Sequence, residues 1–507
     1  MKKFSELVAD IPFLNSLDLP SDPFISGIAG AFQDCTQGGI FVADVSETTD
    51  RDQISEHLDG ADYLDHAVKT GVSVIITRPD VIKPKCDYDL IFIQHPEPLT
   101  FLGSLAAAFY DHAAPEYVGA VTGTDGKTST VNFSAQLFAL IGKKSIAVGN
   151  MGLRVSGRQF IGHLPPNLSV PETVDFQRML SEYRADSYEA VFTEATSHAL
   201  HDYRLNGSPL FAAAITNLTH DHLDFHGTME NYVAAKMRLF GGVLPEGHAA
   251  ILNTDMDYYD EFRAVCEARN HKIIGYGKAA KDLELLGSKH VDKGLDIRFK
   301  WQGREHTVTA PLIGHFQAYN ILCALGFMEA AGFKAEDVVP LVAQIESVPG
   351  RMEYIGTSQT GGRIYVDYAH TPDGMQQALK SIREAAYKSV TVVFGCDGRR
   401  DKEKRPIMGR IAEELADTVI LTHSFPRDED PDDITRDTLA GMNKPENVQY
   451  IRERAAAIEH AITATEPGDI VLIVGAPTSD PWINTMANDE QTTDSKLVTE
   501  ILTRRRH

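Results

Sequence analysis

Residues 121–130 read VTGTDGKTST, and this stretch decides the fold of the chain. It follows an apolar run, Tyr117–Val121, and precedes a helical pattern at Val131–Gly142. A strand, a glycine loop and a helix in this order form the context in which a short motif predicts phosphate binding. A tight turn is the structural alternative. Glycine, lysine and threonine in this order after a strand nevertheless favour a nucleotide site.

The residue types within the loop suit an anion. Gly123 and Gly126 allow the backbone to turn closely around a phosphate, and Lys127 can reach the outer phosphates. Thr128 carries a hydroxyl that suits Mg²⁺. The loop is about two residues shorter than the usual GxxxxGK(S/T) pattern.

The composition describes a globular protein of several domains. The chain has 507 residues, of which 43% are hydrophobic and 23% are charged, and this length predicts about three domains. The net charge of -23 argues against a nucleic-acid or membrane partner, because such partners select clustered Lys and Arg. Five cysteines without CxxC spacing predict a cytoplasmic location and no structural zinc. We expect no signal peptide and no membrane-spanning segment.

Strand and helix patterns alternate along nearly the whole chain, which predicts an α/β fold with mostly parallel sheets. We expect three domains, at residues 1–113, 114–345 and 346–507. Breakers at Pro349 and Gly350 mark the start of the third. The expected strands include Tyr188–Thr193, Phe211–Thr216, Ile364–Val366, Val390–Phe394, Thr418–Leu421 and Ile470–Val474.

Polar residues gather where two of the expected strands end. Glu194 follows the first, and residues 216–226, which follow the second, read TNLTHDHLDFH. Ligands of open α/β sheets bind outside the carboxyl ends of the strands, so Glu194 is placed to coordinate a metal held by the nucleotide. Capping of the next helix is the simpler role for that carboxylate. The density of metal-competent groups in residues 216–226 favours a functional site.

Three segments together resemble the Mur ligase family. They are TGTDGKTST at 122–130, EATSHAL at 194–200 and TNLTHDHLDFHGTMENYVAAKMRLF at 216–240. The resemblance is closest to the ligases that add the third residue to UDP-N-acetylmuramoyl-L-alanyl-D-glutamate in peptidoglycan synthesis (the MurE type). It implies a three-domain architecture with a central P-loop, ATP-binding parallel sheet and a Rossmann-like C-terminal domain. The implied activity is ATP-dependent amide formation through an acyl phosphate.

The resemblance also implies roles for individual residues. Catalytic roles would fall to Lys127, Glu194, His222, Lys236 and Arg351, and Mg²⁺ would be held by Thr128, Glu194, His222 and a carbamylated Lys236. Asn217 and Asn320 would lie near the adenine, Arg351 near the γ-phosphate and Asp367 near the ribose. Asp125 stands where the family usually has Asn. The residues expected at ATP are Gly123, Thr124, Asp125, Gly126, Lys127, Thr128, Ser129, Asn217, Asn320, Arg351 and Asp367.

The segments expected to contact the other substrates depart from the family pattern. Residues 31–33 read AFQ in place of Asp-Ser-Arg, and residues 169–171 read SVP in place of Thr-Thr-Pro. Residues 424–427 read SFPR in place of Asp-Asn-Pro-Arg, and residues 475–479 read GAPTS in place of GKGHE. In the members of the family that select diaminopimelate, the last two elements hold this amine. Because both are altered here, we do not expect diaminopimelate as the amine. The residues still expected at the substrates are Ser169, Ser197, Arg204, Arg427, Gly475 and Ser479.

Three interpretations remain open on sequence alone. The first is a third-residue ligase of cell-wall synthesis that joins a UDP-N-acetylmuramoyl dipeptide, or an analogue, to an amino acid. The second is a diverged ligase of a specialised pathway, with a non-muramoyl acid as its substrate. The third is a nucleotide-binding regulatory protein without catalysis, which the complete set of phosphate and metal groups disfavours.

Overall fold

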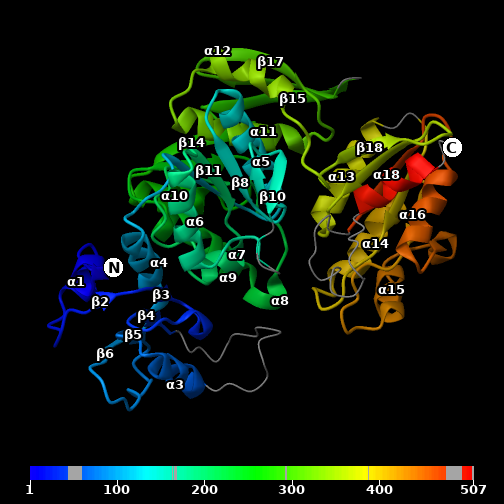
Figure 1. Cartoon of the computed structure of the whole chain (residues 1–507). Helices are drawn as coiled ribbons and strands as arrows, with labels where there is room; N and C mark the ends of the chain where they lie inside the picture. Colours follow the sequence, from blue (N-terminus) through cyan, green and yellow to red (C-terminus); the bar gives the residue numbers. More distant parts are fainter. Residues whose placement is uncertain are drawn as a thin grey trace.

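The computed structural model describes residues 1–43, 60–162, 164, 168–291, 294–385, 388–475 and 494–504. Within these residues the chain forms three α/β lobes, each on its own main sheet, and the second lobe lies between the other two (Figure 1). We call them the N-terminal lobe (sheet at residues 28–94), the central lobe (117–310) and the C-terminal lobe (353–474). Each sheet falls inside one of the three expected domain ranges, whose limits stay predictions.

The N-terminal lobe has a parallel sheet of order β3-β4-β5-β6. Its strands are β3 (Ile28–Ala29), β4 (Ile40–Val42), β5 (Val74–Thr77) and β6 (Ile91–Gln94). Leu105 of α4 (Leu99–Phe109) packs on one face, and Leu64 of α3 (Gly60–Thr70) packs on the other. The remaining elements are β1 (Lys2–Lys3), β2 (Phe24–Ile25), α1 (Phe4–Leu7), α2 (Pro12–Asn15) and η1 (Phe32–Asp34).

The central lobe has a sheet of order β10-β9-β8-β11-β7-β12-β13-β14-β15-β16-β17. Neighbouring strands are parallel from β8 to β15. They are antiparallel at the two ends, in β10-β9-β8 and in β15-β16-β17. Its strands are β7 (Tyr117–Thr122), β8 (Ser145–Gly149), β9 (Gly152–Val155), β10 (Gln159–Gly162), β11 (Ala190–Glu194), β12 (Ala212–Ile215), β13 (Ala249–Asn253), β14 (Lys272–Gly277), β15 (Leu283–Val291), β16 (Gly294–Trp301) and β17 (Arg304–Ala310).

Helices cover both faces of the central sheet, as the alternating pattern predicts. Phe138 of α5 (Lys127–Leu140) and Phe327 of α11 (Phe316–Ala330) pack on one face. The other face is covered by α6 (Thr173–Ala185), α7 (Ser197–His201), α9 (Met229–Arg238) and α10 (Tyr259–Ala268). Shorter elements are α8 (Leu223–His226), η2 (Leu239–Val243), α12 (Ala335–Val338) and η3 (Val339–Gln344).

The C-terminal lobe has a sheet of order β18-β19-β23-β20-β21-β22, in which β18 alone is antiparallel. Its strands are β18 (Glu353–Thr357), β19 (Arg363–Asp367), β20 (Val390–Phe394), β21 (Thr418–Leu421), β22 (Gln449–Tyr450) and β23 (Ile470–Val474). On one face lie α13 (Pro372–Ala385), α14 (Lys404–Leu415) and α15 (Pro431–Leu439), and on the other lie α16 (Arg454–Thr463) and α18 (Asp494–Arg504), with η4 (Pro445–Asn447) before β22.

The expected strands are found, but the ends of β11, β12 and β19 differ from the expected ranges by one or two residues. β20, β21 and β23 span the residues that the sequence predicts, but α5 begins at Lys127 rather than at Val131. Gly126 takes the left-handed conformation (φ 83°) directly before this helix, so Lys127 and Thr128 lie in its first turn. The antiparallel extension β15–β17 was not expected. No helix in the described parts of the chain is long and apolar enough to cross a membrane.

Gly103 offers a test of the contact between the N-terminal and central lobes. A Cβ at this position of α4 would lie 1.8 Å from the Asn206 carbonyl oxygen. Alanine normally stabilises a helix relative to glycine. We expect Gly103→Ala instead to destabilise the protein by about 1–3 kcal/mol, because the backbone of the central lobe has to move. Thermal unfolding measures this; Gly242→Ala is the control, since its Cβ meets nothing within 4 Å. Equal melting temperatures for both variants would contradict this packing.

Candidate active site

A cleft of about 650 Å³ lies between the central and C-terminal lobes. The central lobe contributes the glycine loop and the segments after β11, β12 and β13. The C-terminal lobe contributes residues 367–374, after β19, and 397–404, after β20. Because the carboxyl ends of parallel strands of two sheets border the same space, the cleft has the position expected of a ligand site in α/β proteins.

The glycine loop is held by a small set of hydrogen bonds. Lys127 Nζ donates to the carbonyl oxygens of Gly123 (3.0 Å) and Thr124 (2.7 Å). Asn217 accepts from two loop amides, from Thr124 through its backbone oxygen (2.9 Å) and from Asp125 through its side chain (2.8 Å). Gly123 has φ 136°, and a Cβ there would lie 1.9 Å from Thr216 Oγ1. Asn217 therefore braces the loop at the cleft wall.

Thr128 and Glu194 meet at the base of the cleft. The Thr128 hydroxyl donates to Glu194 Oε1 over 2.9 Å, and the same oxygen accepts from the Asn150 amide over 2.9 Å. Arg351, from the C-terminal side, donates to Thr128 Oγ1 over 3.1 Å. Glu194 is only 2% exposed. A hydroxyl and a buried carboxylate beside a glycine loop are the hard oxygen donors that Mg²⁺ prefers, so these two residues fit the ion that the sequence predicts.

Lys236 lies beneath the glycine loop rather than in solvent. Its side chain is 1% exposed, its Nζ donates to the Gly123 carbonyl oxygen over 2.7 Å, and Nζ lies 4.5 Å from the centre of the Tyr232 ring. Burial, aided by the charge of Lys127, holds the pKa of Lys236 well below its usual value. The amine is therefore neutral far more readily than that of a surface lysine, which makes it nucleophilic.

His222 completes the central-lobe side of the site. Its backbone is left-handed (φ 53°) directly before α8, and its Nε2 lies 3.3 Å from Asp221 Oδ2. The His198 ring packs edge-on against it at 4.8 Å. Burial lowers the pKa of His222, and a neutral imidazole is the form that binds a metal. Asp221, next to it in the sequence, also lines the cleft and was not selected individually by the sequence analysis.

The residues expected at the nucleoside lie on two walls of the cleft. Asn320 of α11 donates to Gln317 Oε1 over 2.9 Å. Asp367, at the end of β19, accepts from the amides of Met352 (2.7 Å) and Ala369 (2.8 Å), and burial raises its pKa. Asn320, Asp367 and Ser129, near the start of α5, all line the cleft.

Asp125 points toward the C-terminal lobe. Its carboxylate accepts a hydrogen bond from the Thr371 hydroxyl over 3.3 Å, and its backbone oxygen accepts one from Thr216 over 2.5 Å. Burial raises the pKa of Asp125 to about 6. The residue that departs from the family pattern thus connects the glycine loop to the opposite wall of the cleft.

The expected substrate residues are less concentrated. Ser169 lines the cleft, and Gly475 donates its amide to the Asp367 carbonyl oxygen over 3.2 Å. Ser197 is buried, and its hydroxyl has no hydrogen-bond partner among the described residues. Arg204 pairs with Asp202 (3.0 Å). Ser479 lies outside the described residues.

Arg427 is not brought into the cleft. It is exposed, and its Nη1 donates to the Arg399 carbonyl oxygen over 3.1 Å. The neighbouring Ser424 hydroxyl donates to Asp397 Oδ1 over 2.5 Å, and Asp397 does line the cleft. The family resemblance covers the segments 366–373 and 395–406, but it did not single out Asp397, His370 or Lys404. The signal that was available is their position in loops that follow β19 and β20.

Comparisons with known proteins agree with this geometry. Residues 121–328 match the Mur ligase middle domain, and residues 350–477 match the Mur ligase glutamate ligase domain. The UDP-N-acetylmuramoyl-L-alanyl-D-glutamate--2,6-diaminopimelate ligase of Caulobacter vibrioides is 34% identical over 457 residues, which cover 90% of this chain and 91% of the relative. The enzyme of the same name from Zymomonas mobilis is 36% identical, with coverages of 82% and 84%.

The solved structures extend the likeness to the whole fold. A structure of a UDP-N-acetylmuramoyl-L-alanyl-D-glutamate--2,6-diaminopimelate ligase superimposes with a TM-score of 0.69 at 26% identity, covering 100% of this chain and 99% of that one. Mycobacterium tuberculosis folylpolyglutamate synthase, solved with ADP, shares the fold with a TM-score of 0.62 at 16% identity, over 78% of this chain and 95% of that one. The cleft, the lobes and these likenesses lead to one conclusion: the chain belongs to the Mur ligase family and is an ATP-dependent ligase that forms carbon–nitrogen bonds.

Proposed function

We propose that the cleft binds ATP with its phosphates on the glycine loop and its nucleoside between Asn320 and Asp367. The main support for this proposal is that four residues line the cleft close to one another: Lys127, Thr128, Glu194 and Arg351. Two cations and two Mg²⁺-type oxygen donors supply the charge neutralisation that transfer of a γ-phosphoryl group requires. Mg²⁺, bound by Thr128, Glu194 and His222, would add to this neutralisation.

The proposed reaction has two steps. A carboxylate oxygen of the acid substrate attacks the γ-phosphorus, ADP leaves, and an acyl phosphate forms. The amine nitrogen of the second substrate then attacks the acyl carbon, phosphate leaves, and the amine loses a proton. Lys127 and Arg351 hold the transferred group in place.

For the acid we propose a UDP-N-acetylmuramoyl dipeptide, after the names of the relatives, and for the amine an amino acid other than diaminopimelate. Ser424 and Phe425 stand where the diaminopimelate enzymes carry a polar element, and the Ser424 hydroxyl is committed to Asp397. A non-muramoyl acid is the second candidate. It is favoured by Phe32, whose ring packs on Tyr63 (4.6 Å) where the family has a uridine diphosphate contact.

The test is phosphate release by the purified protein with ATP and Mg²⁺ across a matrix of acids and amino acids. The matrix includes the UDP-N-acetylmuramoyl dipeptide with and without diaminopimelate. Release that needs both an acid and an amine supports a ligase, and the active pair identifies the substrates. Tight ATP binding with no release from any pair would leave the regulatory protein as the better interpretation.

Lys127→Ala should lower kcat by about 10²–10³-fold or more, because the variant loses charge at the developing phosphoryl transition state. Steady-state phosphate release with the active pair measures the loss. Lys272→Ala, at an exposed lysine of β14, is the matched control and should retain wild-type turnover. A Lys127→Ala enzyme with near-normal kcat would remove the glycine loop from the mechanism.

We also propose that Lys236 is carbamylated. Its neutral, buried amine can attack CO₂, releasing one proton and leaving a carboxylate beside the glycine loop. Lys236→Ala should therefore lose turnover, and short carboxylic acids such as formate or acetate should restore part of it by occupying the vacated space. Lys127→Ala should not respond to the same acids. Failure of every small acid to restore turnover, together with an unmodified Lys236 by mass spectrometry of the intact enzyme, would reject carbamylation.

Asp125→Asn should change how stability depends on pH in the ligand-free protein. Burial raises the pKa of Asp125 from 3.8 to about 6, with Asp221 and Asp373 also raising it and Lys127 and Arg351 opposing them. The unfolded carboxyl ionises first as pH rises, so the wild type loses stability between about pH 4 and pH 6. The amide variant should gain about 2–3 kcal/mol relative to wild type across this window. A melting-temperature difference that is the same at pH 4 and pH 7 would refute the shift.

A further inference from the structure

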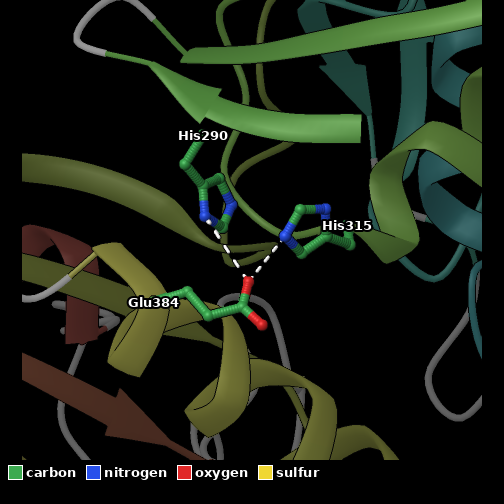
Figure 2. Close-up of side chains that lie close together, drawn as sticks. All are labelled: His290, His315 and Glu384. Carbon is green, nitrogen blue, oxygen red and sulfur yellow. Dashed lines mark ion pairs between the residues drawn. The ribbon is translucent and has the colours of Figure 1, made fainter. Parts of the chain in front are cut away.

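A second cluster of metal-binding side chains lies outside the proposed ATP site. His290 is the penultimate residue of β15, His315 directly precedes α11, and Glu384 lies near the end of α13. Figure 2 shows the two imidazole rings on one side and the carboxylate of Glu384 on the other, with all three pointing toward one another. Two of the side chains belong to the central lobe and the third to the C-terminal lobe.

The distances within this cluster are short. His315 Nε2 lies 2.6 Å from Glu384 Oε2, and His290 Nδ1 lies 3.8 Å from the same oxygen (Figure 2). The two ring centres are 4.6 Å apart, and one nitrogen or oxygen atom from each residue lies within 4.8 Å of the others. Three donors of this kind can enclose one ion after small side-chain rotations, since metal–ligand bonds are about 2.0–2.2 Å long.

The surroundings of the two histidines orient their rings. The Ser288 hydroxyl lies 2.6 Å from His315 Nδ1, which leaves Nε2 facing the cluster. The His290 side chain is 13% exposed, and its Nδ1 is buried without a hydrogen-bond partner. For His315, the Ser288 hydroxyl on the second nitrogen is the usual support of a ligating imidazole.

We propose that His290, His315 and Glu384 bind one Zn²⁺-class ion that joins the central lobe to the C-terminal lobe. Two imidazoles and a carboxylate are the donor set of three-ligand zinc sites, and nitrogen donors select Zn²⁺, Co²⁺ or Ni²⁺ over Mg²⁺. The expectation of no structural zinc came from the spacing of the cysteines alone. It does not bear on a site made of histidine and glutamate.

Binding requires one local exchange. The Gly314 amide now donates to His290 Nε2 over 3.1 Å, so in this arrangement the ring proton is on Nδ1. For Nδ1 to bind the ion, the proton moves to Nε2 and the Gly314 hydrogen bond is given up. A simple ion pair between His315 and Glu384 explains the shorter contact. It does not explain why the His290 ring places a buried nitrogen without a hydrogen bond near the same carboxylate.

The site lies beside the cleft, because His315 and Phe316 are also among the residues that line it. An ion held here would connect the start of α11, which carries Asn320, to α13, which follows Thr371. Metal binding would therefore favour the arrangement in which both walls of the cleft face each other. This inference is independent of which acid and amine the enzyme joins.

The test is metal binding to the full-length protein after removal of metals with a chelator. Titration with Co²⁺ should give visible absorption bands of a low-symmetry, four-coordinate ion. Competition for Zn²⁺ between the protein and a chromophoric chelator should give the number of ions bound per chain. His290→Ala, His315→Ala and Glu384→Gln should each lose one equivalent and the corresponding bands. His306→Ala, a half-buried histidine of β17 in the same sheet extension, is the matched control and should bind as wild type does.

Glu384→Gln decides the outcome if a histidine variant folds poorly, since this side chain is 53% exposed and the change is isosteric. Zn²⁺ should raise the melting temperature of the wild type and not that of Glu384→Gln. The proposal is overturned if the wild type takes up no Co²⁺ or Zn²⁺. It is equally overturned if all three variants keep the wild-type stoichiometry and bands, because the ions would then lie elsewhere, for example at His198, His222 and His226.

Discussion

The carbonyl oxygen of Gly123 accepts hydrogen bonds from two lysines, and the rest of the site depends on this arrangement. Lys127 approaches it from the start of α5, and Lys236 approaches it from α9, which packs on the opposite face of the sheet. The loop can present this oxygen only because Gly123 has a positive φ and leaves room for Thr216. Burial lowers the pKa of Lys236, and the charge of Lys127 on the same acceptor lowers it further. The loop therefore holds a buried lysine that loses its proton readily next to one that stays at the cleft.

An acidic chain has to gather positive charge locally to bind a polyphosphate. The net charge of this protein is -23, yet Lys127, Arg351, Arg400 and Lys404 all line one cleft. Lys127 begins α5, Arg351 lies just before β18, and Arg400 and Lys404 belong to the basic stretch 399–405 after β20, so the fold brings three separate segments to one place. The acidic remainder of the surface disfavours nonspecific polyanions.

Much of the proposed ATP site could be expected from the sequence, because many of its residues lie in short motifs next to strands. Gly123 to Thr128 and Glu194 are examples, whereas Lys236, on helix α9, was expected only from the family resemblance. Strand patterns also located β20, β21 and β23. The direction of Asp125 could not be predicted, since it depends on how two lobes meet. The exposure of Arg427 could not, since it depends on how the loops after β20 and β21 pack on each other. The cluster of His290, His315 and Glu384 shows the same limit. Its members come from distant segments of the chain and lie close together only because two lobes meet there.

Helix α13 is held by the central lobe near both of its ends. Thr371, just before the helix, bonds Asp125, and Glu384, near its end, meets His290 and His315. Most of the helix lies between these two contacts, which are therefore about 20 Å apart along its axis. A swing of the C-terminal lobe about the length of α13 would leave both contacts close to its axis. Such a swing would instead separate contacts away from that line, such as His220 with Asp401 at 3.1 Å.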